Sequence, residues 1–155
     1  MANLLRWEAP STYSGGNLAD ATAMASRATG YYSPAQVSAA DVVIDNAANK
    51  HKYLTIEASL ASIAFVLTDY MNFYLLYAYD GTNYESGSTT LLPTADHLWR
   101  RTGFGAAATS ARRFGVTGLI LPYKFKVLWE TKIAATLAGS GSTLSYQTFG
   151  DNLNG

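Results

Sequence analysis

The segment from residue 72 to residue 84 constrains the fold of this chain more than any other. Residues 72–79 form an apolar run that leads directly into Asp80-Gly81. Because aspartate and glycine accept the positive φ angles of a tight turn, two apolar runs joined by this dipeptide indicate a β-hairpin. A similar signal closes the chain, where glycines and serines at 139–142 separate two apolar runs. Both signals predict an all-β fold.

The run at 72–79 is apolar on both faces of the expected strand. Alternation along a strand separates two sets of side chains: Phe73, Leu75, Tyr77 and Tyr79 on one face, and Tyr74, Leu76 and Ala78 on the other. A strand of this kind is typical of a sandwich whose outer face is covered. A second subunit is one way to cover it.

Further short strands are expected from residue 41 onward. They are placed at residues 42–44, 53–58, 63–67, 99–104, 113–120, 124–131 and 143–149. Turn signals such as Leu121-Pro122 separate them, and no long amphipathic helix is evident. About eight short strands at this spacing are typical of a two-sheet antiparallel sandwich. We therefore predict a jelly-roll-like β-sandwich over residues 41–155.

Residues 1–40 differ in composition from the rest of the chain. They are rich in Ala, Ser, Thr, Gly and Tyr and show no sustained hydrophobic period, so they cannot bury enough surface to become ordered alone. Yet Trp7, Tyr13, Tyr31 and Tyr32 each have about 150–250 Å² of surface to bury. We interpret the segment as an extended N-terminal arm that is ordered by lying across a neighbouring molecule. A disordered tail and an edge strand of the same domain remain alternatives.

The composition indicates contact with other protein. Charged residues make up 14% of the chain, acids and bases balance at 11 each, and there are 11 tyrosines. Few charges together with many aromatic side chains are typical of protein interfaces, although an ordinary monomer with few charges is the alternative. Zero net charge argues against nucleic acid or a membrane surface as the partner.

No apolar stretch approaches the roughly 20 residues of a membrane span, and no signal peptide is visible. We expect a protein that is made in a cytoplasm and is used there or within a larger particle.

The charges are divided unevenly along the sequence. Residues 1–98 contain four bases and nine acids, whereas residues 99–155 contain seven bases and two acids. Complementary contacts between copies would use such a division. Mixing of the two halves within one sandwich would cancel the charge difference, and we favour this second interpretation.

The residues of catalysis and metal binding are sparse. The chain has no cysteine and two histidines, His51 between two lysines and His97 beside Asp96, which is no zinc-ligand pattern. Ser140 and Ser142 have no nucleophile-elbow context, and no glycine-rich segment leads into a helix with a lysine. A glycosidase pair of carboxylates is the one remaining enzymatic alternative. We expect no catalytic, cofactor or metal site.

A series of short blocks between residues 40 and 149 has a characteristic order and spacing. The blocks are Asp45-Asn46, Phe73-Tyr74-Leu75-Leu76-Tyr77, Asp80-Gly81-Thr82-Asn83-Tyr84, Leu119-Ile120-Leu121-Pro122, Lys124-Phe125-Lys126-Val127-Leu128 and Ala138-Gly139-Ser140-Gly141-Ser142-Thr143-Leu144. The series resembles a family of small structural proteins of tailed bacteriophages. The resemblance implies a jelly-roll domain located in the virion, where it decorates or cements the capsid. Its partners would be the major capsid protein or another virion protein, and copies of itself.

Two groups of residues are candidates for these contacts. The first is formed by the aromatic residues of the arm, Trp7, Tyr13, Tyr31 and Tyr32. The second is Trp99-Arg100-Arg101 with Arg112-Arg113, which would share one edge if residues 103–110 formed a hairpin. Arginine beside tryptophan is typical of an interface anchor. Edge-strand charges that deter aggregation are an equal alternative.

A carbohydrate-binding sandwich is the alternative function. The turn from Tyr79 to Tyr84 also resembles a loop of galactose-binding-like sandwiches, such as modules of phage tails. In that case Tyr79, Tyr84 and Trp99 would stack on sugar rings.

Overall fold

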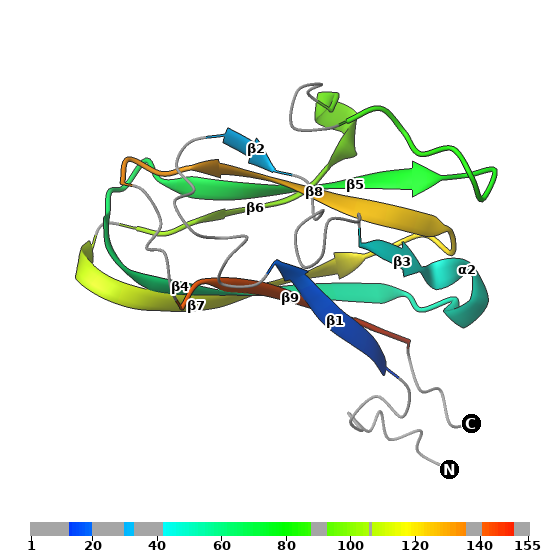
Figure 1. Cartoon of the computed structure of the whole chain (residues 1–155), viewed down its shortest axis with the longest axis horizontal. Coiled ribbons are helices and arrows are strands. Elements are labelled where there is room, and N and C mark those ends of the chain that lie inside the picture. The colour runs from blue at the N-terminus through cyan, green and yellow to red at the C-terminus, as the bar shows by residue number, and fades with distance from the viewer. Residues whose placement is uncertain are drawn as a thin grey trace, which may run out of the picture.

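The computed structural model describes residues 13–19, 30–32, 42–87, 93–105, 107–135 and 141–150. These residues form two antiparallel sheets that face each other (Figure 1). The strands are β1 (Tyr13–Ala19), β2 (Gly30–Tyr32), β3 (Val43–Asp45), β4 (Tyr53–Phe65), β5 (Tyr70–Ala78), β6 (Leu98–Gly103), β7 (Ala107–Leu119), β8 (Lys124–Lys132) and β9 (Thr143–Phe149). A short helix, α2 (Asn46–Asn49), follows β3, and the 3-10 turn η1 (Ala95–His97) precedes β6.

The strands have the order of a jelly roll. The four-stranded sheet has the order β1-β9-β4-β7, and the five-stranded sheet has the order β2-β8-β5-β6, with β3 also pairing with β8. The first strand therefore lies beside the last, β2 and β3 beside β8, β4 beside β7, and β5 beside β6, all antiparallel. This nested pairing is that of one long hairpin wrapped around a core. The predicted jelly-roll-like sandwich is confirmed.

The inward faces of both sheets form one hydrophobic core. Alternation from Leu54 to Leu60 of β4 buries every second residue, as expected for a strand with one solvated face. The largest fully buried side chains of this core are Trp129, Phe73, Phe125, Leu18, Leu54, Ile56, Leu60, Met71 and Leu144. Burial of each such side chain contributes about 1.5–3 kcal/mol, so this core is the main source of stability.

Strand β5 is buried on both faces, as the sequence predicts. Phe73, Leu75 and Tyr77 belong to the core, whereas Tyr74 and Leu76 form a second apolar cluster with Leu128 on the outer face. Gly87 of the same chain helps to cover that face. It lies so close to Leu76 that a Cβ built on Gly87 would be only 2.9 Å from Leu76 Cδ1, and the same Cβ would be 3.4 Å from Pro93 Cβ. Figure 1 shows the connection that carries η1 above the five-stranded sheet. No second subunit is needed at Leu76.

Both predicted hairpins are wrong, although the tight turn itself is present. Gly81 has a φ of 79°, and its N–H donates to the carbonyl of Ala78 at 3.0 Å. The chain then returns beside the end of β5, where the N–H of Glu85 donates to the carbonyl of Tyr77 at 2.9 Å, but it forms no strand. The strands that pair with β5 are β8 along its whole length and β6 from Tyr70 to Tyr74. At the other end of the sequence, β8 and β9 lie in different sheets, so they do not pair as a hairpin.

The strands expected at 53–58 and 63–67 form one long strand. β4 continues to Phe65 with irregular register after Leu60, and the residues that follow it make an exposed turn. Asp69 holds this turn, because its carboxylate accepts the N–H of Val66 at 2.9 Å and that of Ala134 at 3.0 Å.

Two stretches of the expected arm are strands of the sandwich. β1 pairs with β9 over Tyr13 to Ala19, and β2 pairs with residues 129–131 of β8. Of the alternatives for residues 1–40, an edge strand of the same domain therefore describes these two stretches, and the sandwich begins before residue 41.

Bases and acids from the two halves of the sequence mix within the sandwich. Arg113 lies 2.6 Å from Glu57, and Lys124 lies 3.6 Å from Asp45. These exposed ion pairs contribute little stability, but they partly cancel the charge division along the sequence.

Replacing Asn46 with alanine is expected to destabilise the fold by roughly 3 kcal/mol. The buried Asn46 side chain donates to the carbonyls of His51 and Leu121 and accepts the N–H of His51, each at 2.9 Å. Loss of the amide leaves three backbone groups without partners. Urea unfolding measures the change, with the exposed Asn49→Ala as the control. Equal midpoints for the two variants would contradict this role of Asn46.

Candidate functional site

Four residues with exposed apolar side chains lie where β5 ends and where β7 turns into β8. Tyr79, Leu119, Leu121 and Tyr123 are 55%, 65%, 45% and 38% exposed. The rings of Tyr79 and Tyr123 meet edge to face, with 5.1 Å between their centroids. We refer to these four residues as the tyrosine–leucine end. Single exposed apolar residues are ordinary, but such a group indicates an interaction surface.

The backbone of the tyrosine–leucine end is held by side chains from two other elements. The N–H of Leu121 donates to the hydroxyl of Tyr77 at 3.1 Å, and its carbonyl accepts from Asn46 Nδ2 at 2.9 Å. Both backbone groups of Leu121 are therefore fixed, one from β5 and one from α2. A loop held in this way presents its side chains with little further loss of conformational freedom on binding.

The turn after β5 positions Tyr79 at this end. The carboxylate of Asp80 accepts the N–H of Asn83 at 2.7 Å and that of Thr82 at 2.8 Å, and these bonds lower the pKa of Asp80 below its ordinary value. The ring of Tyr79 also stacks on that of Tyr77, with 5.8 Å between centroids. Partial burial and the nearby Glu85 carboxylate raise the pKa of Tyr79, so its hydroxyl stays neutral and able to donate at physiological pH.

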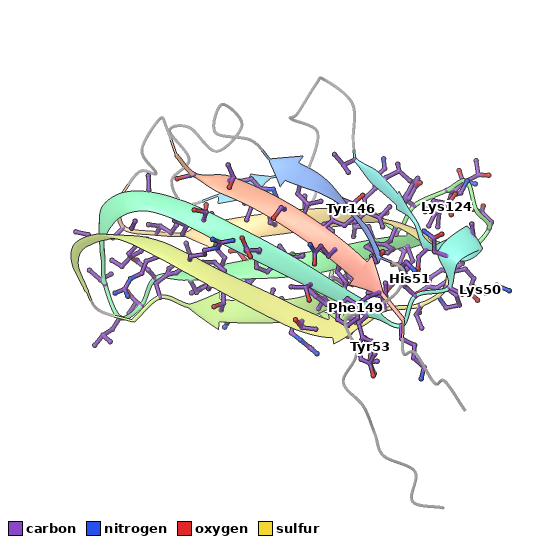
Figure 2. The ribbon with its side chains drawn as sticks, turned by 90° about the horizontal axis from the view of Figure 1, so that it is seen from below. Lys50, His51, Tyr53, Lys124, Tyr146 and Phe149 are labelled. Carbon is purple, nitrogen blue, oxygen red and sulfur yellow. The ribbon has the colours of Figure 1, made fainter. Side chains whose placement is uncertain are left out.

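Charged side chains border the tyrosine–leucine end on the side of α2. Lys124 pairs with Asp45 at 3.6 Å, and the exposed Lys50 follows α2 with a φ of 51°. Figure 2 shows Lys50 and Lys124 at this end of the sandwich, close to α2. An apolar centre beside charged residues has the composition of a protein interface.

The four arginines that the sequence placed on one edge lie in separate places. β6 and β7 lie in different sheets, so they form no hairpin within one sheet. Arg113 pairs with Glu57 across β4 and β7. Arg101 lies on the outer face of the five-stranded sheet, where Nε donates to Asn72 Oδ1 at 2.7 Å. The expected arginine edge is therefore wrong.

Trp99 and Arg100 protect the free edge of β7. Trp99 Nε1 donates to the carbonyl of Leu119 at 2.8 Å, and Arg100 Nε donates to the carbonyl of Thr117 at 3.1 Å. The guanidinium lies so close over Gly118 that a Cβ there would come within 2.5 Å of Nη2. These contacts correspond to the alternative of edge protection, which the sequence left open.

The other two arginines have different surroundings. Arg101 stacks on Tyr70 at 4.4 Å, and its partner Asn72 donates to the buried Glu130 at 2.5 Å. Glu130 also accepts from the hydroxyl of Tyr74 at 3.1 Å, so this group is a polar network of the sheet itself. Arg112 has a buried Nε without a hydrogen-bond partner among the described residues.

The three residues of the sugar-binding alternative each contact other residues of the fold. Tyr79 belongs to the tyrosine–leucine end, and Trp99 uses its indole N–H on β7. The ring of Tyr84 is covered by Lys126, whose Nζ lies 4.4 Å from the ring centroid. Each ring thus already has a partner within the fold, and only Tyr79 is more than half exposed.

The aromatic residues of the arm are only partly described. Tyr13 lies on β1 opposite Phe149, and Tyr31 and Tyr32 lie on β2 opposite Glu130 and Trp129. Trp7 lies outside the described residues. The expected contacts of these four side chains with a neighbour stay predictions.

The histidines take part in contacts within the fold. His51 is buried and its Nδ1 lies 2.8 Å from Thr148 Oγ1, whereas His97 lies 3.1 Å from Glu85. Figure 2 shows His51 near Phe149, which stacks on Tyr53 with 5.3 Å between centroids. Among the described residues, no three His, Cys, Asp or Glu side chains group as metal ligands. Within the same part of the chain, no helix has the length and apolar character needed to cross a membrane.

Comparison with known proteins adds no relative to this description. No protein-family model matches the chain, and no curated protein is similar to it in sequence.

The Tyr77→Phe variant is expected to weaken the support of the tyrosine–leucine end. At pH 7 the variant should lose about 1–2 kcal/mol of stability, because the N–H of Leu121 loses its acceptor. Burial raises the pKa of Tyr77 above 10.0, although the N–H of Leu121 offsets part of this shift. Because the pKa of Tyr77 is raised in the folded protein, the stability that its hydroxyl contributes is complete below pH 10. This stability is lost as the pH rises through the pKa of the folded protein.

Thermal unfolding measured between pH 7 and pH 11 tests this expectation. The melting temperature of the natural protein should fall more steeply above pH 10 than that of Tyr77→Phe. Tyr123→Phe is the control, because its hydroxyl has no hydrogen bond among the described residues. Parallel curves for the natural protein and Tyr77→Phe would show that Tyr77 has no such role.

Proposed function

We propose that this chain is a non-enzymatic structural protein of a bacteriophage virion that decorates or cements the capsid. The observation that supports this proposal most is that three of the phage-like blocks of the sequence meet in the fold. The block at Asp45-Asn46, the block ending at Tyr77 and the block beginning at Leu119 are far apart in the chain. They are joined at the tyrosine–leucine end by the bond from Asn46 to Leu121 and the bond from Leu121 to Tyr77.

The fold is compatible with this role. Jelly rolls with two four-to-five-stranded sheets are used by viral capsid proteins, and also by lectins and cupins. Because one fold serves several functions, the argument depends on the surface and not on the topology. The surface that stands out is apolar and aromatic, which favours attachment to protein.

Attachment through the tyrosine–leucine end has a simple physical basis. Tyrosine is enriched among the residues that dominate binding energy, and Tyr79 and Tyr123 would be desolvated together with the two leucines. The fixed backbone of Leu121 lowers the ordering cost of binding. A shell offers many equivalent sites, so a weak contact repeated many times, or made by a multivalent protein, still gives firm attachment.

Purified particles of the virus that encodes this chain provide the direct test. Mass spectrometry should find the protein at the copy number of a structural component, and its absence from the particle would refute the proposal. Saturable binding of glycans by the isolated protein, without binding to shells, would instead support the carbohydrate-binding alternative.

The docking surface is tested by substitution. Tyr79→Ser and Tyr123→Ser should each weaken binding to shells that lack the protein by at least ~10-fold, because buried interface tyrosines contribute about 2 kcal/mol or more. Leu67→Ser is the matched control, because Leu67 is 78% exposed in the turn before β5, at the opposite end of that strand. The melting temperature should change little in all three variants. Equal affinities for the three variants would exclude the tyrosine–leucine end as the docking surface.

A further inference from the structure

The edges of the two sheets differ in how they are protected against pairing with other chains. Exposed strand edges are templates for further pairing, and proteins protect them with short strands, charges and covering side chains. The edge of β7 is covered by Trp99 and Arg100. On the five-stranded sheet, β6 carries Arg100 and Arg101 and has an irregular register, and the opposite edge consists of β2 and β3, each three residues long.

The edge of β1 is longer than those of β2 and β3, and no side-chain hydrogen bond covers it among the described residues. β1 is the outermost strand of the four-stranded sheet and pairs on one side with β9. On its other side it pairs with no strand in the part of the chain that the structure describes. Its seven residues, Tyr-Ser-Gly-Gly-Asn-Leu-Ala, include no charged residue and no proline. Figure 2 looks toward this sheet, with β7 and β1 at its two margins.

The contacts of β7 show which way the backbone groups of β4 point. The carbonyls of Thr117 and Leu119 accept from side chains of β6, so they point away from β4. Tyr53 is opposite Leu119, and Thr55 is opposite Thr117. Both therefore direct their N–H and C=O groups to the other neighbour, β9, because the two groups of one residue in an antiparallel strand point to the same side.

The same alternation continues to β1. Phe149 and Gln147 are opposite Tyr53 and Thr55, so their backbone N–H and C=O groups point toward β4. The bond from the N–H of Lys52 to the carbonyl of Phe149 agrees with this direction. The backbone groups of the even-numbered residues of β9 therefore point toward β1. In β1, Ser14 and Gly16 bond to β9, whereas Tyr13, Gly15 and Asn17 direct their backbone groups outward.

We infer that β1 pairs antiparallel with β1 of a second copy of this chain, about a twofold axis at Gly15. The regular part of β1 runs from Tyr13 to Asn17, because the register shifts between Asn17 and Ala19, and Gly15 is its centre. Tyr13 of each copy lies opposite Asn17 of the other, and the two Gly15 residues face each other. All three outward residues then exchange hydrogen bonds across the axis.

A second copy is the partner that the geometry favours. An antiparallel strand pair about a twofold axis is self-complementary, so it closes into a dimer and leaves no further edge of the same kind. The two four-stranded sheets become one continuous sheet across the dimer. Gly15 has no side chain to interfere at the axis. This inference does not rest on the capsid proposal, because a free dimer is compatible with any role of the protein.

Proline substitutions at adjacent positions test the inference with a matched control. Gly15→Pro removes an outward N–H and leaves the pairing with β9, and proline is tolerated on an edge strand in this orientation. Gly16→Pro removes an N–H that bonds to β9. Sedimentation equilibrium of the full chain should show a dimer for the natural protein. The dissociation constant should rise at least ~10-fold for Gly15→Pro, whose melting temperature should stay within a few degrees, while Gly16→Pro should melt at a clearly lower temperature.

Amide hydrogen exchange in the natural protein tests the same pairing without a variant. The N–H groups of Ser14 and Gly16 should be protected at every protein concentration, and those of Gly15 and Asn17 only where the dimer forms. A natural protein that stays monomeric at millimolar concentration overturns the inference. So does a Gly15→Pro protein that dimerises as tightly as the natural one. If Gly15→Pro does not fold, concentration-dependent protection of Gly15 supports the inference and its absence overturns it.

Discussion

The pairing of β5 with β8 is the interaction on which the rest of the structure depends. The two strands are opposite each other without interruption, from Tyr70 and Lys132 to Ala78 and Lys124. Their inward side chains make up much of the core, and their outward side chains form the second apolar cluster. β5 also fixes both ends of the sandwich, because Asp69 just before it holds the chain at Val66 and Ala134, and Tyr77 near its end holds Leu121. The tyrosine–leucine end thus derives its shape from the most buried strand.

Local chemistry was sufficient to predict most of the strands from residue 41 onward, but not their partners. β9 has the predicted bounds, and the Asp80-Gly81 turn has the predicted positive φ, because both depend on neighbouring residues. The partners of β5 are β6 and β8, which are distant in sequence, so no local pattern selects them over the residues after the turn. The arginine edge failed for the same reason, because it required β6 and β7 to pair within one sheet.

The candidate site was visible in the sequence only in part. Tyr79 was identified from its position at the turn, whereas Leu119 was placed at the end of a strand and Leu121 in a turn, and neither was expected to take part in binding. A signal was present in Pro122, which cannot donate to a sheet, so the apolar residues around it are in a loop. Trp99 was expected to be an exposed anchor, whereas its indole N–H is used on the edge of β7. Which apolar residues are exposed depends on the packing of the sheets and not on local pattern.

The two proposed surfaces are compatible with each other. The tyrosine–leucine end is formed by the turn after β5 and the loop between β7 and β8, whereas β1 lies at the far margin of the four-stranded sheet from β7. A dimer through β1 would therefore present two tyrosine–leucine ends. Two ends on one rigid particle-binding unit would raise the effective affinity for a shell without any new type of contact.

Hydrogen–deuterium exchange of the protein free and bound to purified particles tests the central claim most directly. The claim is that a jelly roll attaches to the shell by its tyrosine–leucine end. It predicts that binding slows exchange in residues 78–84 and 119–123, while the turn at 66–69 exchanges at the same rate in both states. Protection confined to other parts of the chain, or no protection on particles that carry the protein, would contradict it.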